Sequence, residues 1–179
     1  IGYNIYFFCY KIKDMAKYII HRVNNKNQIQ KDYTIDGFEC DINNYKKKLV
    51  MHHDLNKKGD TFKKFFFKID KRQIVFLNIK SSGIINQIIN KIKNKRNIFL
   101  LDISFSEIDF LLKKNLSKLI ILRYSIYEKL NLKSKFFKKV IWVWVDFFQN
   151  KKIDFKTYKY IKKYKKKICL ASPELLGGK

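Results

Sequence analysis

Ionisable side chains recur in this sequence at the ends of short apolar stretches. His21 and Arg22 follow one such stretch, Glu39 and Asp41 lie in the next, and His53 closes a third. Two carboxylates, two imidazoles and a guanidinium are the groups that a metal-assisted cleavage of a phosphodiester needs. In an α/β barrel such groups gather at the carboxyl ends of the strands, and we expect the site there.

Glu39 and Asp41 are two residues apart, and alternate residues of a strand share a face. We therefore expect both carboxylates to point into the barrel mouth and Cys40 to point outward to the helices. An isolated Glu-x-Asp is more often an exposed pair on an edge strand, but the flanking histidines favour a site. Two carboxylates on one face repel unless a cation lies between them. Without a cluster of His or Cys, Mg²⁺ or Ca²⁺ fits this pair better than zinc.

His21 and His53 are two of only three histidines in the chain. The imidazole pKa lies near neutral pH, so one of them can protonate a leaving oxygen while the other deprotonates a nucleophile. A lone histidine at a strand end is more often structural, whereas two that flank an acidic pair favour catalysis. By alternation His52 should face the other way, and Asp54 should orient a histidine or cap the next segment.

Apolar runs alternate with amphipathic ones along the chain. Continuous Ile, Val, Leu and Phe runs predict strands in a parallel sheet, at residues 18–23, 37–42, 48–53, 74–80, 98–104, 119–125, 140–148 and 167–172. Helical spacing predicts helices at 55–71, 84–92, 106–115 and 155–165. The helix at 84–92 carries an apolar stripe formed by Ile84, Ile85, Ile88, Ile89 and Ile92. No Gly-rich turn follows the first strand, as dinucleotide and P-loop folds require. We therefore predict an α/β fold, a TIM-type (β/α) barrel that is short or incomplete at the C-terminal end.

We predict one phosphodiesterase-like barrel domain at 17–179, preceded by an extension or strand at 1–16. One Pro and six Gly leave no linker, and the lack of an initial Met suggests an N-terminal truncation.

No apolar stretch approaches the roughly 20 residues that span a bilayer. The three cysteines show no paired spacing, which favours a reduced, cytoplasmic compartment.

The chain is strongly basic, with 40 Lys and Arg against 15 acidic residues and a formal net charge of +25. Such a balance points to a polyanion as partner. The excess is mostly Lys spread among Ile, Asn, Phe and Tyr, which we attribute to codon composition. Arg, which suits bidentate phosphate contacts, occurs only at Arg22, Arg72, Arg96 and Arg123. Nucleic acid is therefore not favoured as the partner, and a small phosphodiester, which the candidate site would take, is the expected one.

Four short motifs, taken in order, resemble those of a known family. They are His21-Arg22, Glu39-Cys40-Asp41, the segment 49–54 and Asn78-Ile79-Lys80. The sequence resembles the glycerophosphodiester phosphodiesterases, which are TIM barrels related to the phosphatidylinositol-specific phospholipases C. Segments 142–146 and 168–175 resemble a bacterial phosphodiesterase-like subgroup associated with surface-polysaccharide gene clusters. The resemblance spans residues 17–177 and implies a metal-dependent phosphoric diester hydrolase of lipid or polysaccharide metabolism.

The resemblance also implies roles for individual residues. The catalytic histidines of the family fall on His21 and His53, and its first two metal ligands fall on Glu39 and Asp41. Its phosphate-contacting basic residues fall on Arg22 and Lys80.

Two positions depart from the pattern of the family. Val23 stands where the family usually has Gly, and Asn78 stands where it usually has a third carboxylate ligand. An amide oxygen still coordinates Mg²⁺ or Ca²⁺, but without its charge the metal affinity should fall. Two alternatives therefore stay open, a catalytically weakened barrel that binds a phosphorylated ligand or partner, and a basic RNA-binding protein.

Further polar residues lie at predicted strand ends and are candidates to complete the pocket, namely Asp102, Arg123, Asp146 and Glu174. We expect Arg123 to bind a second anionic group of the substrate. Ser172-Pro173-Glu174 fits better a loop with a helix N-cap at Ser172. Trp142 and Trp144 share a strand face, where aromatic packing is the default.

Overall fold

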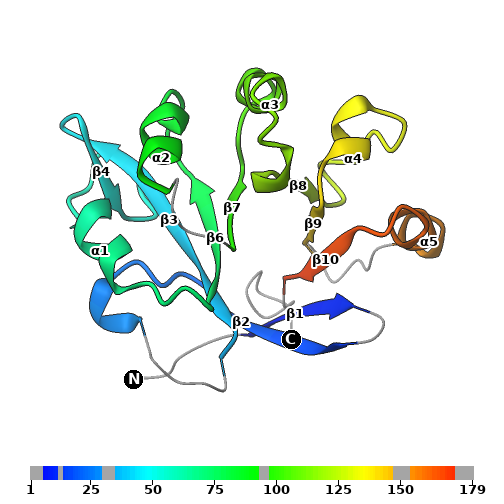
Figure 1. Cartoon of the computed structure of the whole chain (residues 1–179), viewed down its shortest axis with the longest axis horizontal. Helices are drawn as coiled ribbons and strands as arrows, with labels where there is room; N and C mark the ends of the chain where they lie inside the picture. Colours follow the sequence, from blue (N-terminus) through cyan, green and yellow to red (C-terminus); the bar gives the residue numbers. More distant parts are fainter. Residues whose placement is uncertain (1–5, 12–13, 30–34, 93–96, 147–153, 172–179) are drawn as a thin grey trace.

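The computed structural model of the chain describes residues 6–11, 14–29, 35–92, 97–146 and 154–171 (Figure 1). Ten strands and five α-helices lie in these ranges. In chain order the elements are β1 (Tyr6–Lys11), β2 (Asp14–Ile20), η1 (Lys26–Gln28), β3 (Gly37–Tyr45), β4 (Lys48–Met51), β5 (Asp60–Thr61), α1 (Phe62–Lys68), β6 (Ile74–Ile79), α2 (Ile85–Ile92), β7 (Ile98–Leu101), α3 (Phe105–Lys113), η2 (Ser117–Leu119), β8 (Ile121–Tyr124), α4 (Lys135–Lys139), β9 (Trp142–Val145), α5 (Phe155–Lys163) and β10 (Lys167–Leu170).

The strands belong to one mixed sheet that contains two parallel groups. β2, β3, β6 and β7 form one group, and β8, β9 and β10 form the other. β1 joins the groups on one side by pairing antiparallel with both β2 and β10. On the other side, one isolated parallel bridge, Leu100 to Ile120, links the region of β7 to that of β8. The strands thus curve around a common interior.

The predicted α/β class is confirmed, but the sheet is not the regular barrel of parallel strands that we expected. Only two residues separate β1 from β2, which is too few for a parallel crossover, so the two strands form an antiparallel pair. The predicted strand at 48–53 is the shorter β4, which pairs antiparallel with β3. Lys46 and Lys47 between them have φ of 47° and 63°, the left-handed conformation of a two-residue hairpin turn. Between β7 and β8 the ladder is reduced to the single bridge.

The helices lie in an arc outside the strands (Figure 1). The predicted stripe on α2 is confirmed, because Ile85, Ile88 and Ile92 are all buried. α3 begins at a capping box in which Ser104 and Glu107 satisfy each other's backbone N–H groups. α1 occupies part of the predicted helix 55–71, and α4 was not predicted because its five residues are too few to show a helical period.

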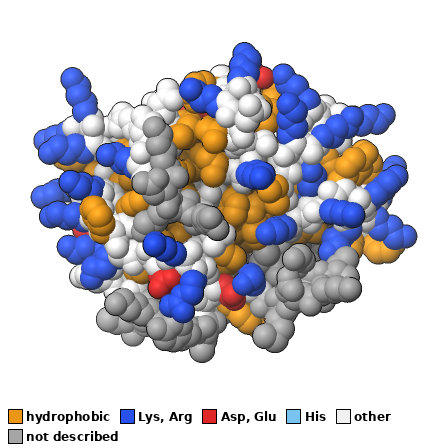
Figure 2. All heavy atoms as spheres, viewed as in Figure 1, with side chains coloured by type: hydrophobic (Ala, Val, Ile, Leu, Met, Phe, Trp, Pro, Cys, Tyr) orange, Lys and Arg blue, Asp and Glu red, His pale blue; other side chains and the backbone are white. Residues whose placement is uncertain are grey.

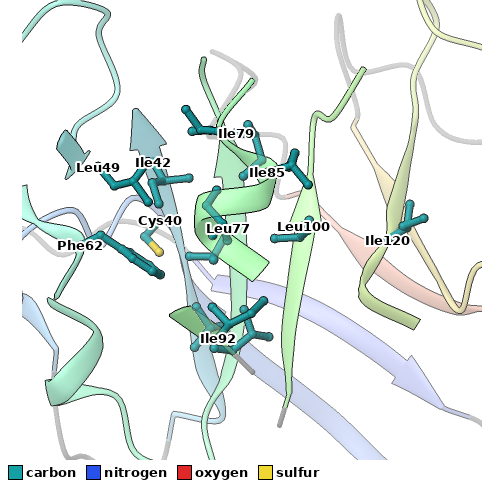
Figure 3. Close-up of a cluster of buried hydrophobic side chains, with 14 of the residues drawn as sticks. Cys40, Ile42, Leu49, Phe62, Leu77, Ile79, Ile85, Ile92, Leu100 and Ile120 are labelled. Carbon is teal, nitrogen blue, oxygen red and sulfur yellow. The ribbon is translucent and has the colours of Figure 1, made fainter. Parts of the chain in front are cut away.

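Alternating residues of the strands pack on opposite sides of the sheet, toward the helices or into the interior. Cys40 on β3, Leu77 on β6 and Leu100 on β7 point toward α2 and the helix layer (Figure 3). The residues of the opposite face fill the interior, where Phe76 lies edge-to-face against Trp142 and Trp144. Trp142 and Trp144 share this face as predicted. The interior beneath the carboxyl ends of the strands is therefore apolar and aromatic.

A close approach of two strands explains the glycine at the start of β3. A Cβ atom at Gly37 would lie 1.9 Å from the carbonyl oxygen of Ile74 on β6. Glycine alone lets β3 and β6 pair from Gly37 to Ile42 in this register. The same register places Asp41 directly beside Asn78.

Lysine and arginine side chains are scattered over the face shown in Figure 2, with apolar side chains exposed between them. In the described part of the chain, no helix is both long and apolar enough to cross a bilayer. Cys40 and Cys169 are buried free thiols.

Candidate functional site

The acidic pair lies on the inner face of β3, as its spacing predicts. Glu39 and Asp41 are 0% and 1% exposed, while Cys40 between them belongs to the apolar cluster under the helices. β3 is paired on both sides, with β2 and β6, so these carboxylates are not on an edge strand. Burial of two neighbouring carboxylates is unfavourable unless charged or polar groups compensate them.

Glu39 is only partly compensated by its surroundings. Its Oε2 accepts a hydrogen bond of 2.9 Å from the backbone N–H of Arg22 and lies 3.5 Å from Nε2 of His21. Its Oε1 is buried and has no hydrogen-bond partner among the described residues. Burial, and next the charge of Asp41, raise the pKa of Glu39 well above its usual range. The ionised form of Glu39 therefore requires additional positive charge.

Asp41 has more partners than Glu39. Its Oδ2 accepts a hydrogen bond of 2.8 Å from the Asn24 side chain, whose Oδ1 accepts one of 2.7 Å from the Asp41 N–H. Nζ of Lys80 lies 3.3 Å from Oδ1 of Asp41. Asn24 was missed in the sequence, where it is one of many asparagines and only its position two residues after Arg22 marks it.

A strained turn after β2 brings Arg22 to Glu39 and to His53. Arg22 has φ of 55°, a left-handed conformation that is unfavourable for a residue with a Cβ. This conformation aims its N–H at Glu39, while Nη2 of its side chain lies 3.1 Å from Nε2 of His53. Val23, at the position of the family's usual Gly, buries its side chain in the apolar cluster under the helices.

The two histidines lie in different electrostatic surroundings. Burial, and next the charge of Arg22, lower the pKa of His21 to about 4, so its imidazole is neutral at pH 7. Nδ1 of His53 lies 2.9 Å from Oδ1 of Asp54. Because a guanidinium only donates, a neutral His53 accepts from Arg22 at Nε2 and donates to Asp54 from Nδ1. Asp54 thus orients a histidine, as expected.

Asn78 completes an oxygen-lined group on the inner face. It lies on β6 beside Asp41, is 6% exposed, and its Oδ1 has no hydrogen-bond partner in the described ranges. Glu39 and Asn78 therefore each present a buried, unpaired oxygen, and Asp41 adds a second carboxylate. Such oxygens are the ligands that Mg²⁺ and Ca²⁺ prefer. The described residues hold no cluster of three His, Cys, Asp or Glu that could bind a metal, and here the third group is an amide.

A second charged cluster surrounds Arg123. Its Nε and Nη2 donate to the two carboxylate oxygens of Asp102 at 2.7 and 2.6 Å, and its Nη1 donates to Asp146. The indole N–H of Trp144 donates to the other oxygen of Asp146 at 2.8 Å. Arg123, Asp102 and Asp146 do converge, but in this structure the guanidinium is paired with carboxylates of the chain itself. Its predicted contact with a substrate anion stays a prediction, and Ser172 and Glu174 lie outside the described residues.

A polar cavity of about 340 Å³ lies between the two clusters. Its lining includes Lys80, directly after β6, Asp102, directly after β7, and Arg123 on β8. Glu128, from the segment that follows β8, also lines it. Because Nζ of Lys80 also contacts Asp41, this cavity adjoins the carboxylate pair. A ligand in the cavity would therefore lie next to the oxygen-lined group.

Comparison with known proteins gives a fold but no family at the level of sequence. No protein-family model matches the chain, and no curated protein matches it. The structure is similar to the crystal structure of a glycerophosphodiester phosphodiesterase from Thermotoga maritima, with a TM-score of 0.50 and 13% sequence identity. The similarity covers 88% of this chain and 95% of that one. At this identity the comparison shows a shared fold, which agrees with the fold that the resemblance implies.

Proposed function

We propose that the chain is a metal-dependent phosphodiester hydrolase that acts on a small glycerophosphodiester-like or sugar-phosphodiester substrate. The observation that carries the proposal is the convergence of His21, Arg22, Glu39, Asp41 and Lys80 at one end of the parallel strands. These residues come from β2, β3, β6 and the segments after them, so their meeting depends on the fold. The similarity in fold to a phosphodiesterase supports the same reaction class.

The oxygens of Glu39, Asp41 and Asn78 would hold a divalent cation, Mg²⁺ or Ca²⁺. A cation held there supplies positive charge that polarises a phosphoryl oxygen. The unpaired Oε1 of Glu39 and Oδ1 of Asn78 support this assignment, because buried polar atoms without a partner are unfavourable unless a ligand satisfies them.

The remaining groups of the site match the needs of phosphodiester cleavage. Arg22 and Lys80 offset negative charge on the phosphoryl group. One of His21 and His53 accepts the proton of the attacking water or hydroxyl, and the other protonates the departing alkoxide. An adjacent hydroxyl of the substrate itself can be the nucleophile, in which case a cyclic phosphate forms before hydrolysis.

The test measures the turnover of a panel of diesters with and without Mg²⁺ or Ca²⁺. The panel includes glycerophospho compounds and nucleotide-linked sugars. We expect metal-dependent turnover that falls by at least about 100-fold in His21→Ala and in His53→Ala. His52→Ala is the matched control, since His52 lies beside His53 in the chain and is not among the residues proposed to act on the diester. Retained turnover in either of the two test variants would refute the proposal.

A second candidate is a barrel that binds a phosphorylated ligand without cleaving it. The observation in its favour is that the Lys80 ammonium, 3.3 Å away, already compensates Asp41, and that Asn78 adds no third charge. This candidate predicts that the protein binds inorganic phosphate equally well with and without divalent cation and turns over no diester. The same panel of diesters, together with a measurement of phosphate binding, therefore distinguishes the two candidate functions.

A further inference from the structure

A second cavity, of about 330 Å³, opens beside the polar one. It lies between α3 and the segment that connects β8 to α4. Most of its lining is apolar and comprises Phe105, Ile108, Ile121, Leu122, Leu130 and Phe136. The rings of Phe105 and Phe136 lie 5.8 Å apart. A concave, mainly apolar site with a few polar groups at one end is the usual form of a site for small molecules.

The two cavities lie next to each other and share part of their lining. Asp102, Ile103, Arg123 and Glu128 line both of them. The polar cavity, which Lys80 lines next to Asp41, and the apolar cavity therefore lie on either side of the same four residues, Arg123 among them. A molecule that occupies both cavities needs a polar, anionic end and an apolar end.

We propose that the site takes an amphiphilic phosphoester whose phosphoryl group lies beside Lys80 and whose alkyl or acyl chain lies in the apolar cavity. The inference rests on the proposed function for the position of the phosphoryl group and adds the chemical class of one alcohol of the substrate. A substrate with two small polar alcohols would leave Phe105, Leu130 and Phe136 in contact with water.

Phe105 offers a substitution that changes the cavity without endangering the fold. It is the first residue of α3, after the N-cap Ser104, and it is 75% exposed. An acidic residue at this position interacts favourably with the helix dipole. Phe105→Glu therefore introduces a charge at the apolar cavity while α3 keeps its N-terminal cap.

Phe155 provides a matched control on another helix. It is the first residue of α5, after the N-cap Asp154, and it is 69% exposed. It lines neither of the two cavities described above. Phe155→Glu thus makes the same chemical change at an equivalent helix position.

The experiment measures the affinities of methyl phosphate and hexyl phosphate by titration calorimetry, in the presence of Mg²⁺, for the wild type, Phe105→Glu, Phe105→Leu and Phe155→Glu. Comparing the two phosphates within each variant cancels the effect of the new charge on the phosphoryl group. We expect the wild type to bind hexyl phosphate at least about tenfold more tightly, which requires burial of about two of the five added methylenes. The ratio should fall to nearly one in Phe105→Glu and persist in Phe105→Leu and Phe155→Glu.

Equal affinity of the wild type for both phosphates would overturn the inference and leave the anion site of the proposed function intact. Failure of both phosphates to bind would overturn the inference and the anion site together. A ratio that survives in Phe105→Glu, or that is lost equally in Phe155→Glu, would show that the chain binds elsewhere and would also overturn the inference.

Discussion

The clusters around Glu39 and around Arg123 contain the same kinds of groups but differ in how completely these groups are paired. Around Arg123, both oxygens of Asp102 and both oxygens of Asp146 accept hydrogen bonds from Arg123 or Trp144. Around Glu39, one carboxylate oxygen and the neighbouring amide oxygen of Asn78 have no partner in the described part of the chain.

Under the proposed function, this difference distinguishes a cluster that supports the fold from one that binds a ligand. A satisfied network of buried charges fixes the strand ends against each other, and its donors are already used. A network with unpaired acceptors is unfavourable by itself and is retained where a ligand completes it. We therefore propose that the ion pairs at the ends of β7, β8 and β9 support the fold and that the ends of β2, β3 and β6 carry the chemistry.

The largest expected effect concerns the support cluster. Arg123→Met should lower the free energy of unfolding by about 3 kcal/mol, because it leaves Asp146, whose side chain is 4% exposed, without its positive partner. The measurement is urea denaturation. Arg72→Met is the control, since the ion pair of Arg72 with Asp70 is exposed and should contribute less than about 1 kcal/mol. Equal losses in the two variants would contradict the assignment of Arg123 to support.

The next effect concerns the pH dependence of stability at His21. The folded state holds the His21 pKa at about 4, below its ordinary value of 6.5. Neutral His21 therefore contributes stability that is present above pH 6.5 and is lost as the pH falls toward 4, by up to about 3 kcal/mol. Denaturation of wild type and His21→Gln over this range should show a smaller decline in the variant. Parallel curves would mean that His21 is protonated as easily in the folded state as in the unfolded one.

The positions of the charged residues on the strands were predictable from the sequence, because alternation in β3 fixes which side chains share a face. Glu39 and Asp41 point inward and Cys40 outward, and the Ile stripe of α2 packs as predicted. The direction of individual strands was not predictable. β4 reads as a buried apolar run like its neighbours, and the two lysines at positive φ that turn it back carry no glycine signal.

The partners of the charged residues could not be predicted either. Arg123 was expected to face a substrate, since nothing in the sequence shows that Asp102 and Asp146, 21 and 23 residues away, lie at hydrogen-bonding distance. Asn24 and its reciprocal bonds to Asp41 were missed for the same reason. The alternation of residues along a strand predicts the face on which a side chain lies. Its hydrogen-bond partners depend on the registers of several strands together.

A smaller effect tests whether Glu39 holds a cation. Saturating Mg²⁺ or Ca²⁺, at about 100 times its Kd, should stabilise the wild type by about 2.7 kcal/mol. Glu39→Gln keeps the size of the side chain and removes its charge, so this stabilisation should be lost. The measurement is thermal unfolding with and without the metal. Asp102→Asn serves as the control, and an equal loss of metal stabilisation in that variant would contradict the comparison between the two clusters.

The smallest expected effect, and the sharpest test of the oxygen-lined group, comes from Asn78→Asp. The substitution adds a third carboxylate beside Asp41. It does so at the position where the family that the sequence resembles usually has an acidic ligand. If these oxygens hold a cation, the added charge should tighten Mg²⁺ binding by about tenfold, or about 1.4 kcal/mol. In metal-free buffer the same charge is buried near two others, so the variant should be less stable than the wild type. Opposite shifts with and without metal are hard to produce by any change in packing. A variant that is destabilised equally in both buffers would show that Lys80 alone, rather than a cation, compensates this cluster.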